Sequence, residues 1–281
     1  MKLGYSTWGM PTVPMDVAIP HLAGLGFDGT ELTVIKGWCT ELSTLDAAAR
    51  RTIRDLATRH HLDLDSVYGH NRLLSRDADE TTYDMGRCEE AAQLCLDLSS
   101  GAGEVPGLVI LPGGKPDDWG ELKHVLVERL GSLVRSCERL GVMVALEPHV
   151  SAMIDRPDRV RWLFEQIPSK FLSLNFDISH FEVQGVPMEE SISALAPYAS
   201  RTHVKDERGI APDHQFLIPG EGDFDYVRYL QLMRDIGYDR YVTVEVSLMV
   251  QRRPDYDPLD AAARSYRTLA AAFETAGIAR G

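Results

Sequence analysis

The sequence lacks the features that mark secreted proteins and membrane-spanning proteins. Its 281 residues contain only four cysteines, Cys39, Cys88, Cys95 and Cys137, and no C-x-x-C pair. This pattern favours reduced thiols in a protein core over a disulfide framework. No apolar run approaches the ~20 residues of a membrane span. No secretory signal precedes the first expected strand, so we expect a cytoplasmic protein.

Basic residues are too few for a surface that binds nucleic acid. The chain has 29 Lys and Arg against 42 Asp and Glu, which gives a formal net charge of -13. Nucleic acid and anionic membranes would be repelled by such a charge, and we expect neither as a partner. A small anionic substrate remains compatible, since a bound cation can reverse the local field.

Short apolar runs alternate with longer segments of helical spacing along the whole chain. Runs such as residues 142–146 are apolar at successive positions, as in strands buried on both faces. Eight such units fit a closed barrel better than an open sheet, so we predict an α/β protein with one (β/α)8 TIM-barrel domain over residues 1–281. The expected strands are residues 3–6, 27–34, 62–67, 108–111, 142–146, 171–176, 201–204 and 241–246. Expected helices include residues 44–60, 83–98, 119–140, 158–167, 188–195 and 224–236, with a C-terminal helix at about 258–275.

The longest irregular stretches all follow expected strands. They are residues 69–81, 113–118, 206–222 and 247–257. In a parallel barrel the segments after the strands lie at the C-terminal face, where active sites are built. The site is therefore expected at this end.

Acidic residues and a histidine stand where the last four expected strands end. A carboxylate that ends a buried run costs free energy unless it is paired or binds a cation. Three carboxylates and one imidazole suit Mn²⁺, Mg²⁺ or Co²⁺ better than structural zinc, which prefers Cys and His. We expect one divalent ion, manganese first and magnesium or cobalt as alternatives. The opposing interpretation is that each acid is an ordinary exposed strand-end residue. The four residues are Glu147, Asp177, His203 and Glu245.

The order of five short motifs resembles the xylose isomerase-like TIM-barrel family of sugar isomerases and epimerases, over essentially the whole chain. The motifs are Leu-Glu-Pro-His at 146–149, Phe-Asp-Ile-Ser-His at 176–180, His-Val-Lys-Asp at 203–206, Gly-Glu-Gly-Asp-Phe-Asp at 220–225 and Val-Glu at 244–245. The resemblance implies one divalent metal held by Glu147, Asp177, His203 and Glu245. It also implies proton removal next to a sugar carbonyl, with Glu147 and Glu245 as proton carriers.

His149 favours a more specific hypothesis. It follows Glu147 by two residues, so an extended chain would turn both side chains to the same side. A histidine beside a metal is suited to act as a general base. The Glu-Pro-His arrangement resembles the large subunit of bacterial C-glycoside deglycosidases, which implies a carbon–carbon lyase acting on a 3-keto-sugar with His149 as the base. The alternative for His149 is to orient Glu147.

The competing hypothesis is a sugar or sugar-phosphate isomerase or epimerase that uses the same metal site. Two features depart from the epimerase pattern. The family's epimerases usually carry an arginine six residues after the metal-binding histidine, and Gly209 stands there in this chain, with Arg208 just before it. The second departure is His149. The lyase hypothesis comes first because of His149 and the resemblance of its motif, with the isomerase as its alternative.

His180 and Lys205 are expected to contact the substrate. His180, three residues after Asp177, matches the family's histidine that contacts substrate oxygens; otherwise it is a surface histidine. Lys205 has the strand parity of His203 and could neutralise an enolate. A salt bridge from Lys205 to Glu245 or Asp206 is the other option.

Three further candidates for substrate contact lie in the first half of the chain. Glu31 ends the second expected strand and His70 follows the third. Each could contact sugar hydroxyls or be an ordinary loop residue. Trp8 could stack on a sugar or aglycone, or pack in the core.

The expected partners follow from these hypotheses. They are a small sugar or glycoside substrate, other copies of the chain in an oligomer and, for the lyase, a small β-rich second subunit. An abasic-site DNA endonuclease of the same superfamily would need more histidine ligands and a basic face, which the net charge of -13 opposes. A non-catalytic sugar-binding barrel would lose no function on Glu147→Gln.

Overall fold

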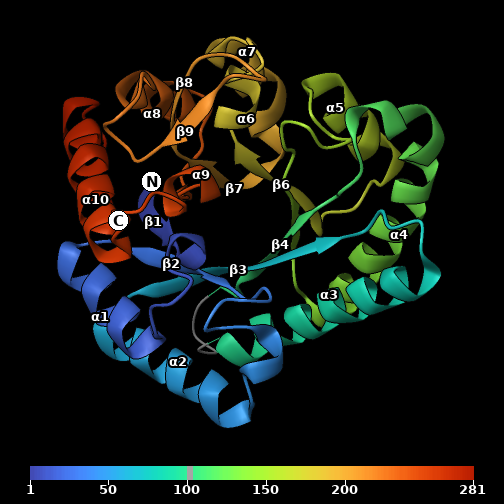
Figure 1. The fold of residues 1–281 in the computed structure, drawn as a ribbon, viewed down its shortest axis with the longest axis horizontal. Helices are drawn as coiled ribbons and strands as arrows, with labels where there is room; N and C mark the ends of the chain where they lie inside the picture. Colours follow the sequence, from blue (N-terminus) through green and yellow to red (C-terminus); the bar gives the residue numbers. More distant parts are fainter. Residues whose placement is uncertain (100–103) are drawn as a thin grey trace.

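Eight parallel strands close into a barrel, as the alternating pattern predicts. The computed structural model describes residues 1–99 and 104–281, except for the side chains of residues 70 and 71. The strands follow the order β1-β10-β7-β6-β5-β4-β3-β2 around the barrel, and β10 pairs with β1 to close it (Figure 1). The (β/α)8 fold is therefore confirmed. The strands are β1 (Lys2–Ser6), β2 (Gly29–Thr33), β3 (Asp63–Arg72), β4 (Gly107–Leu111), β5 (Val144–Leu146), β6 (Leu172–Asp177), β7 (Ala199–Val204) and β10 (Tyr241–Val244).

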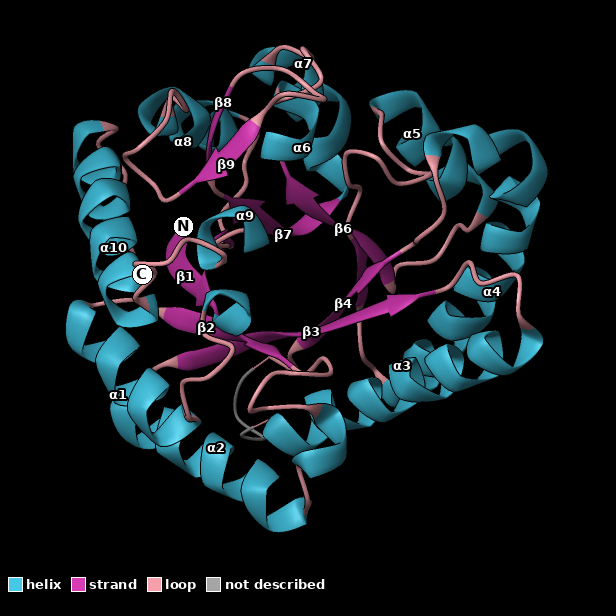
Figure 2. Cartoon of the chain, viewed as in Figure 1, coloured by secondary structure: helices cyan, strands magenta, loops and turns pink. Residues whose placement is uncertain are grey.

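The longer helices form a ring outside the barrel (Figure 2). Local sequence explains their ends: Gly141 terminates α4 in a left-handed conformation with φ 72°, and Asp257 caps α10 by accepting bonds from the N–H groups of Leu259 and Asp260. The ring contains α1 (Met15–Leu25), α2 (Ala47–His60), α3 (Ala78–Leu98), α4 (Trp119–Leu140), α5 (Pro157–Gln166), α7 (Met188–Leu195), α8 (Tyr226–Asp235) and α10 (Pro258–Thr275). The short helices α6 (Ser179–Glu182) and α9 (Leu248–Gln251) follow β6 and β10.

Side chains alternate between two environments along each strand. Leu146 and Val244, for example, belong to the main apolar core, in which the strands pack against the helices. Because side chains alternate along a strand, Glu147 and Thr243 take the opposite direction, into the barrel. The interior is accordingly polar at many positions, and the strands bring these polar residues into layers.

The segment after β7 differs from the predicted irregular stretch at residues 206–222. It contains an antiparallel hairpin of β8 (Asp206–Arg208) and β9 (Gln215–Leu217). The Asp206 carboxylate stabilises this loop by accepting bonds from the N–H groups of Glu207, Gly220 and Phe224. Gly209 has a φ of 80°, a conformation that disfavours an arginine at this position.

Two expectations about environment can be compared with the structure. Cys88, Cys95 and Cys137 are buried free thiols, whereas Cys39 is exposed, so the expected core position was wrong for Cys39 alone. Among the described residues, no helix combines the length and the apolar character that crossing a bilayer requires.

Candidate active site

Four side chains from four neighbouring strands converge at the C-terminal end of the barrel. Glu147 directly follows β5, Asp177 ends β6, His203 lies in β7 and Glu245 directly follows β10. Each offers one ligand atom, and these atoms all lie within 4.8 Å of one another. All four side chains are buried. We call these four residues the acidic cluster.

His203 lies between two carboxylates. Its Nδ1 is 3.0 Å from Glu147 Oε1, and its Nε2 is 3.0 Å from Glu31 Oε1. Burial opposes the protonated imidazole, but Glu31 and Glu147 outweigh burial and hold the pKa of His203 well above its usual value. Without a metal, His203 is therefore a cation that partly neutralises the acidic cluster.

Lys205 is the second cation of the site. Its Nζ lies 2.5 Å from Asp177 Oδ2 and also forms an ion pair with Glu245 Oε2. Burial opposes the charged amine, but these two carboxylates raise the pKa of Lys205 above its usual value. The salt bridge expected between Lys205 and Glu245 is present. The second partner of Lys205 is Asp177, whereas we had considered Asp206.

The charges of the site leave room for a divalent cation. Among the described side chains, four buried carboxylates, the cluster's three and Glu31, surround two cations, His203 and Lys205. Burial raises the pKa of Glu147 to about 7, although His203 opposes this shift. Glu147 Oε2 is buried and has no hydrogen-bond partner among the described residues. Oxygen-rich donors with an unbalanced negative charge fit a hard or borderline divalent ion, so the cluster could hold one.

Two histidines stack beside the acidic cluster. The ring centroids of His149 and His180 are 3.8 Å apart, and His180 Nε2 lies 3.4 Å from Asp177 Oδ2. Neither ring nitrogen of His180 has a hydrogen-bond partner within the described part of the chain. His149 Nδ1 bonds the carbonyl oxygen of Val150, an acceptor, so Nδ1 carries the proton and Nε2 keeps its lone pair. Burial lowers the pKa of both histidines.

Apolar side chains line both sides of the site. On one side Trp8 stacks on Trp38 at 4.9 Å and meets the edge of Tyr68. On the other side Phe216, from the hairpin, packs against His180. Trp8 is buried, which fits the packing role that we considered for it.

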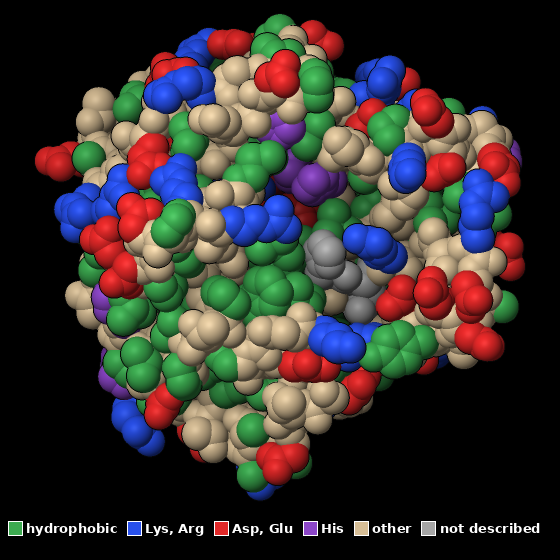
Figure 3. Space-filling view, in the orientation of Figure 1, with side chains coloured by type: hydrophobic (Ala, Val, Ile, Leu, Met, Phe, Trp, Pro, Cys, Tyr) green, Lys and Arg blue, Asp and Glu red, His purple; other side chains and the backbone are tan. Residues whose placement is uncertain are grey.

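A cavity of about 780 Å³ opens beside His149. The ends of β3 and β4 and the segments that follow β3, β4 and β5 line most of it. Its charged side chains are of both signs: Arg72, Arg76, Lys115, Asp77, Glu80, Asp84 and Asp118. Figure 3 shows histidine side chains gathered at the centre of this face, with acidic atoms beside them. The volume exceeds that of a simple sugar, so a substituted sugar would also fit.

Two sequence-predicted residues differ from their expected positions. Glu31 lies in the middle of β2 rather than at its end, and both its oxygens are bonded inside the barrel. His70 belongs to β3, which extends to Arg72, but its side chain is outside the described part of the chain.

Tyr68 is a site residue that sequence reasoning missed. It is buried on β3, its ring lies 5.9 Å from that of His203, and burial together with the nearby Glu147 carboxylate raises its pKa well above the usual value. Its even spacing from Ser66, another interior residue, was the available signal.

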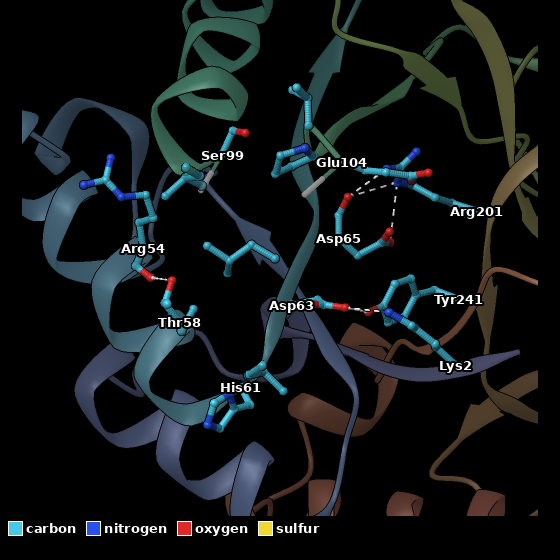
Figure 4. Close-up of a pocket in the computed structure, with 16 residues that line it drawn as sticks. Lys2, Arg54, Thr58, His61, Asp63, Asp65, Ser99, Glu104, Arg201 and Tyr241 are labelled. Carbon is cyan, nitrogen blue, oxygen red and sulfur yellow. Dashed lines mark hydrogen bonds and ion pairs between the residues drawn. The ribbon is translucent and has the colours of Figure 1, made fainter. Parts of the chain in front are cut away.

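A second cavity, of about 500 Å³, lies at the N-terminal end of the barrel (Figure 4). The acidic side chains and the Lys and Arg side chains that line it are all paired, Arg54 and Glu104 with residues outside the cavity. Lys2 Nζ lies 2.8 Å from Asp63 Oδ2, which also accepts a bond from the Tyr241 hydroxyl. Arg201 donates a hydrogen bond to the backbone oxygen of Asp65 and forms an ion pair with the Asp65 carboxylate. This pairing makes the N-terminal cavity a poorer candidate for chemistry than the acidic cluster.

Comparison with protein families gives one match over most of the chain. The family described as xylose isomerase-like TIM barrel matches residues 19–276. Fructoselysine 3-epimerase of Escherichia coli O157:H7 is 26% identical over 274 residues, which cover 90% of this chain and 93% of the relative. Inosose isomerase of Bacillus licheniformis is 27% identical over 147 residues, 50% of this chain and 51% of that protein. For the uncharacterized protein MJ1311 of Methanocaldococcus jannaschii, the match is 27% over 160 residues, about half of each chain.

Solved structures share the fold at lower identity. The IOLI protein with a bound zinc atom superposes with a TM-score of 0.81 and 19% identity over 98% of this chain and 99% of its own. The 3-keto-D-glucoside 4-epimerase YcjR of E. coli superposes with a TM-score of 0.77 and 16% identity, over 96% of this chain and 99% of its own. For a xylose isomerase-like barrel of Mycobacterium smegmatis in complex with magnesium, the TM-score is 0.72 and the identity 16%, over 98% of this chain and 97% of its own. These similarities are evidence of the fold.

Proposed function

The chain belongs to the xylose isomerase-like TIM barrel family, and from that premise we propose that it is a divalent-metal-dependent sugar isomerase or epimerase. Its reaction would begin with removal of a proton from the carbon next to the carbonyl of a keto-sugar. The observation that carries the proposal is the convergence of Glu147, Asp177, His203 and Glu245 within 4.8 Å. Such a buried cluster, in which the pKa values of Glu147 and His203 are raised, is typical of a functional site.

Each side chain of the site has a role in this proposal. When bound, a divalent ion would act as a Lewis acid that polarises the sugar carbonyl. Glu147 and Glu245 follow different strands and would hold or move protons from two sides of the substrate. His180 has unpartnered ring nitrogens and would bond sugar hydroxyls. Lys205 would balance negative charge that develops on the sugar.

The metal and the substrate are proposed at the level of class. The donor set favours manganese, with magnesium or cobalt as alternatives, and related structures that carry zinc or magnesium support a divalent ion in general. Fructoselysine 3-epimerase, the relative matched over 90% of this chain, favours a keto-sugar with an amine-linked substituent. The cavity of about 780 Å³ beside His149 has room for one.

A lyase is the second candidate. Its supporting observation is His149, whose Nε2 lone pair is available beside His180 and could take a proton before an elimination. A further match, inosose dehydratase of Clostridium perfringens, is 22% identical over 147 residues. The relatives named above are mainly epimerases and isomerases, so they support the isomerase hypothesis better than the C-glycoside lyase that we placed first from sequence. The small second subunit belongs to the lyase hypothesis alone.

A solvent-exchange experiment tests the proposal. The protein is loaded with Mn²⁺ and incubated in D₂O with free ketoses, ketose phosphates, fructoselysine and 3-keto C-glucosides. Deuterium at the carbon next to the carbonyl, together with an epimer or isomer, is the expected result, and Glu147→Gln is the inactive control. Release of an aglycone would favour the lyase. Absence of exchange with every substrate, although the metal is bound, would contradict both.

A further inference from the structure

Glu31 has no free oxygen for a sugar. It is almost fully buried on β2, and its Oε1 accepts bonds from Ser6 Oγ at 2.6 Å and from His203 Nε2 at 3.0 Å. Its Oε2 accepts a bond from Ser66 Oγ at 2.9 Å. Ser6 and Ser66 belong to the strands on either side of β2, so three neighbouring strands fix this carboxylate.

The orientation of His203 follows from this bond. Of its two ring nitrogens, Nδ1 faces the acidic cluster, 3.0 Å from Glu147 Oε1 and 4.0 Å from Glu245 Oε1. The side-chain amide nitrogen of Asn175 also lies 3.1 Å from Nδ1, and its N–H group can donate to the lone pair of this nitrogen. A neutral imidazole carries one N–H group, and an ionised carboxylate only accepts hydrogen bonds. Both nitrogens face a carboxylate at 3.0 Å, but only Nδ1 faces the proposed metal ligands. A metal on Nδ1 would take the lone pair of that nitrogen, and the single proton of the neutral ring would then sit on Nε2, where Glu31 accepts it.

We propose that Glu31 is the positioning residue of the metal centre: it holds the Nε2–H group of His203 and thereby presents Nδ1 as the metal-binding atom. The inference rests on the proposed function, because it assumes that the acidic cluster binds a divalent ion. A carboxylate behind a histidine ligand fixes the ring, selects the tautomer and makes the ligand nitrogen more basic. Ser6 and Ser66 hold the carboxylate in turn.

Stability gives no comparable reason for this arrangement. Burying a carboxylate inside a barrel costs free energy that its partners only roughly offset, and apolar side chains of similar volume often do as well. The arrangement is explained if the carboxylate acts on His203.

Metal affinity and the state of His203 test the inference in the whole protein. Metal-free wild type, Glu31→Ala, Glu31→Gln and the control Asp63→Asn are titrated with Mn²⁺ alone. The control makes the same acid-to-amide change at the opposite end of the barrel. The zinc-loaded proteins are then studied by long-range ¹H–¹⁵N NMR, which reports which ring nitrogen of His203 carries the proton.

We expect a graded loss of affinity. Glu31→Ala should weaken Mn²⁺ binding about 10- to 100-fold and remove the uniform Nε2–H form of His203. Glu31→Gln keeps an acceptor but loses the charge, so it should retain the tautomer and lose less than about 10-fold. Asp63→Asn should bind as wild type does.

Different outcomes separate the inference from the proposed function. Wild-type affinity and an unchanged His203 spectrum in a folded Glu31→Ala variant would overturn the inference alone. If that variant does not fold, wild-type affinity in Glu31→Gln would overturn it. Absence of Mn²⁺ binding by the wild-type protein would overturn the proposed function, and the inference with it.

Discussion

The two ends of the barrel contain the same kinds of charged side chain in different balance. At the N-terminal end each described charge has a partner: Lys2 bonds Asp63, and Arg201 bonds Asp65. At the C-terminal end four carboxylates share two cations among the described side chains, so negative charge is in excess there. The paired charges at the N-terminal end need no further ion. At the C-terminal end a bound divalent cation would balance the excess negative charge. Charge balance, more than cavity volume, thus distinguishes the candidate site.

The pKa of each acid follows burial and its own partners at both ends. Burial raises the pKa of Asp65 although Arg201 opposes this shift. Bonds from His203 and two serines outweigh burial and lower the pKa of Glu31.

Burial opposes ionisation of Asp63, but bonds from Lys2 and Tyr241 outweigh burial and lower its pKa. At the C-terminal end, burial raises the pKa of Glu147 to about 7. The four proposed metal ligands all lie at the C-terminal end, so variants at the two ends should separate activity from stability.

The largest effect is expected from Glu147→Gln. This change removes a proposed ligand and proton carrier, so solvent exchange of the substrate should fall at least about 10³-fold, given the several kcal/mol that a Lewis acid supplies. The free energy of unfolding of the metal-free protein should stay the same or rise, because an unbalanced charge is lost. If the Glu147→Gln protein exchanged substrate protons with solvent at nearly the wild-type rate, the assignment of the chemistry to the C-terminal end would be contradicted.

Arg201→Met should have the largest effect on stability. It leaves the buried Asp65 carboxylate without its partner, which should lower the free energy of unfolding by about 3–5 kcal/mol. Urea denaturation measures the loss, and Arg201→Lys, which keeps the charge, should lose less. Mn²⁺ affinity should be unchanged in both. A loss below about 1 kcal/mol in Arg201→Met would contradict the pairing argument.

Removal of the metal should lower the free energy of unfolding only because the acidic cluster at the C-terminal end loses its ion. At a free Mn²⁺ concentration 100 times Kd, binding should add about 2.7 kcal/mol to the free energy of unfolding, and a chelator should remove this increment. Denaturation with and without Mn²⁺ should give the same increment in Asp63→Asn and a smaller one in Glu147→Gln. Equal increments in all variants would mean that Mn²⁺ acts elsewhere.

The smallest effect is expected from Asp63→Asn. Because the folded-state pKa of Asp63 is lowered, its contribution to stability is present above the unfolded pKa and is lost as the pH falls through the folded one. The side chain is largely exposed, so the variant should lose less than about 1 kcal/mol at pH 7. Denaturation curves should show this difference between variant and wild type at pH 7, and the difference should disappear at about pH 3. A difference that grows on acidification would have the wrong sign.

Much of the fold could be read from local sequence. The helix expected at residues 119–140 is α4, because an apolar face and Gly141 mark its course and its end. The residues of the acidic cluster were found because a charge at the end of a buried strand is expensive unless it serves a purpose. Their metal binding stays a prediction.

Contacts across the barrel could not be read in this way. Glu31 and His203 are 172 residues apart, and nothing near either residue indicates that their side chains meet. The pairing of Lys205 with two carboxylates rather than one likewise depends on three different strands. The β8–β9 hairpin was missed because its two short strands form around the Asp206 carboxylate and lack an apolar pattern of their own.

Metal stoichiometry tests the central claim most directly. Metal-free wild type, Asp177→Asn and Asp63→Asn are titrated with Mn²⁺, and the bound metal is counted after removal of the free ion. One ion per chain in wild type and in Asp63→Asn, with binding lost in Asp177→Asn, is the predicted result. No bound ion in wild type, or one ion retained at full affinity in Asp177→Asn, would contradict the assignment of the acidic cluster as a metal centre.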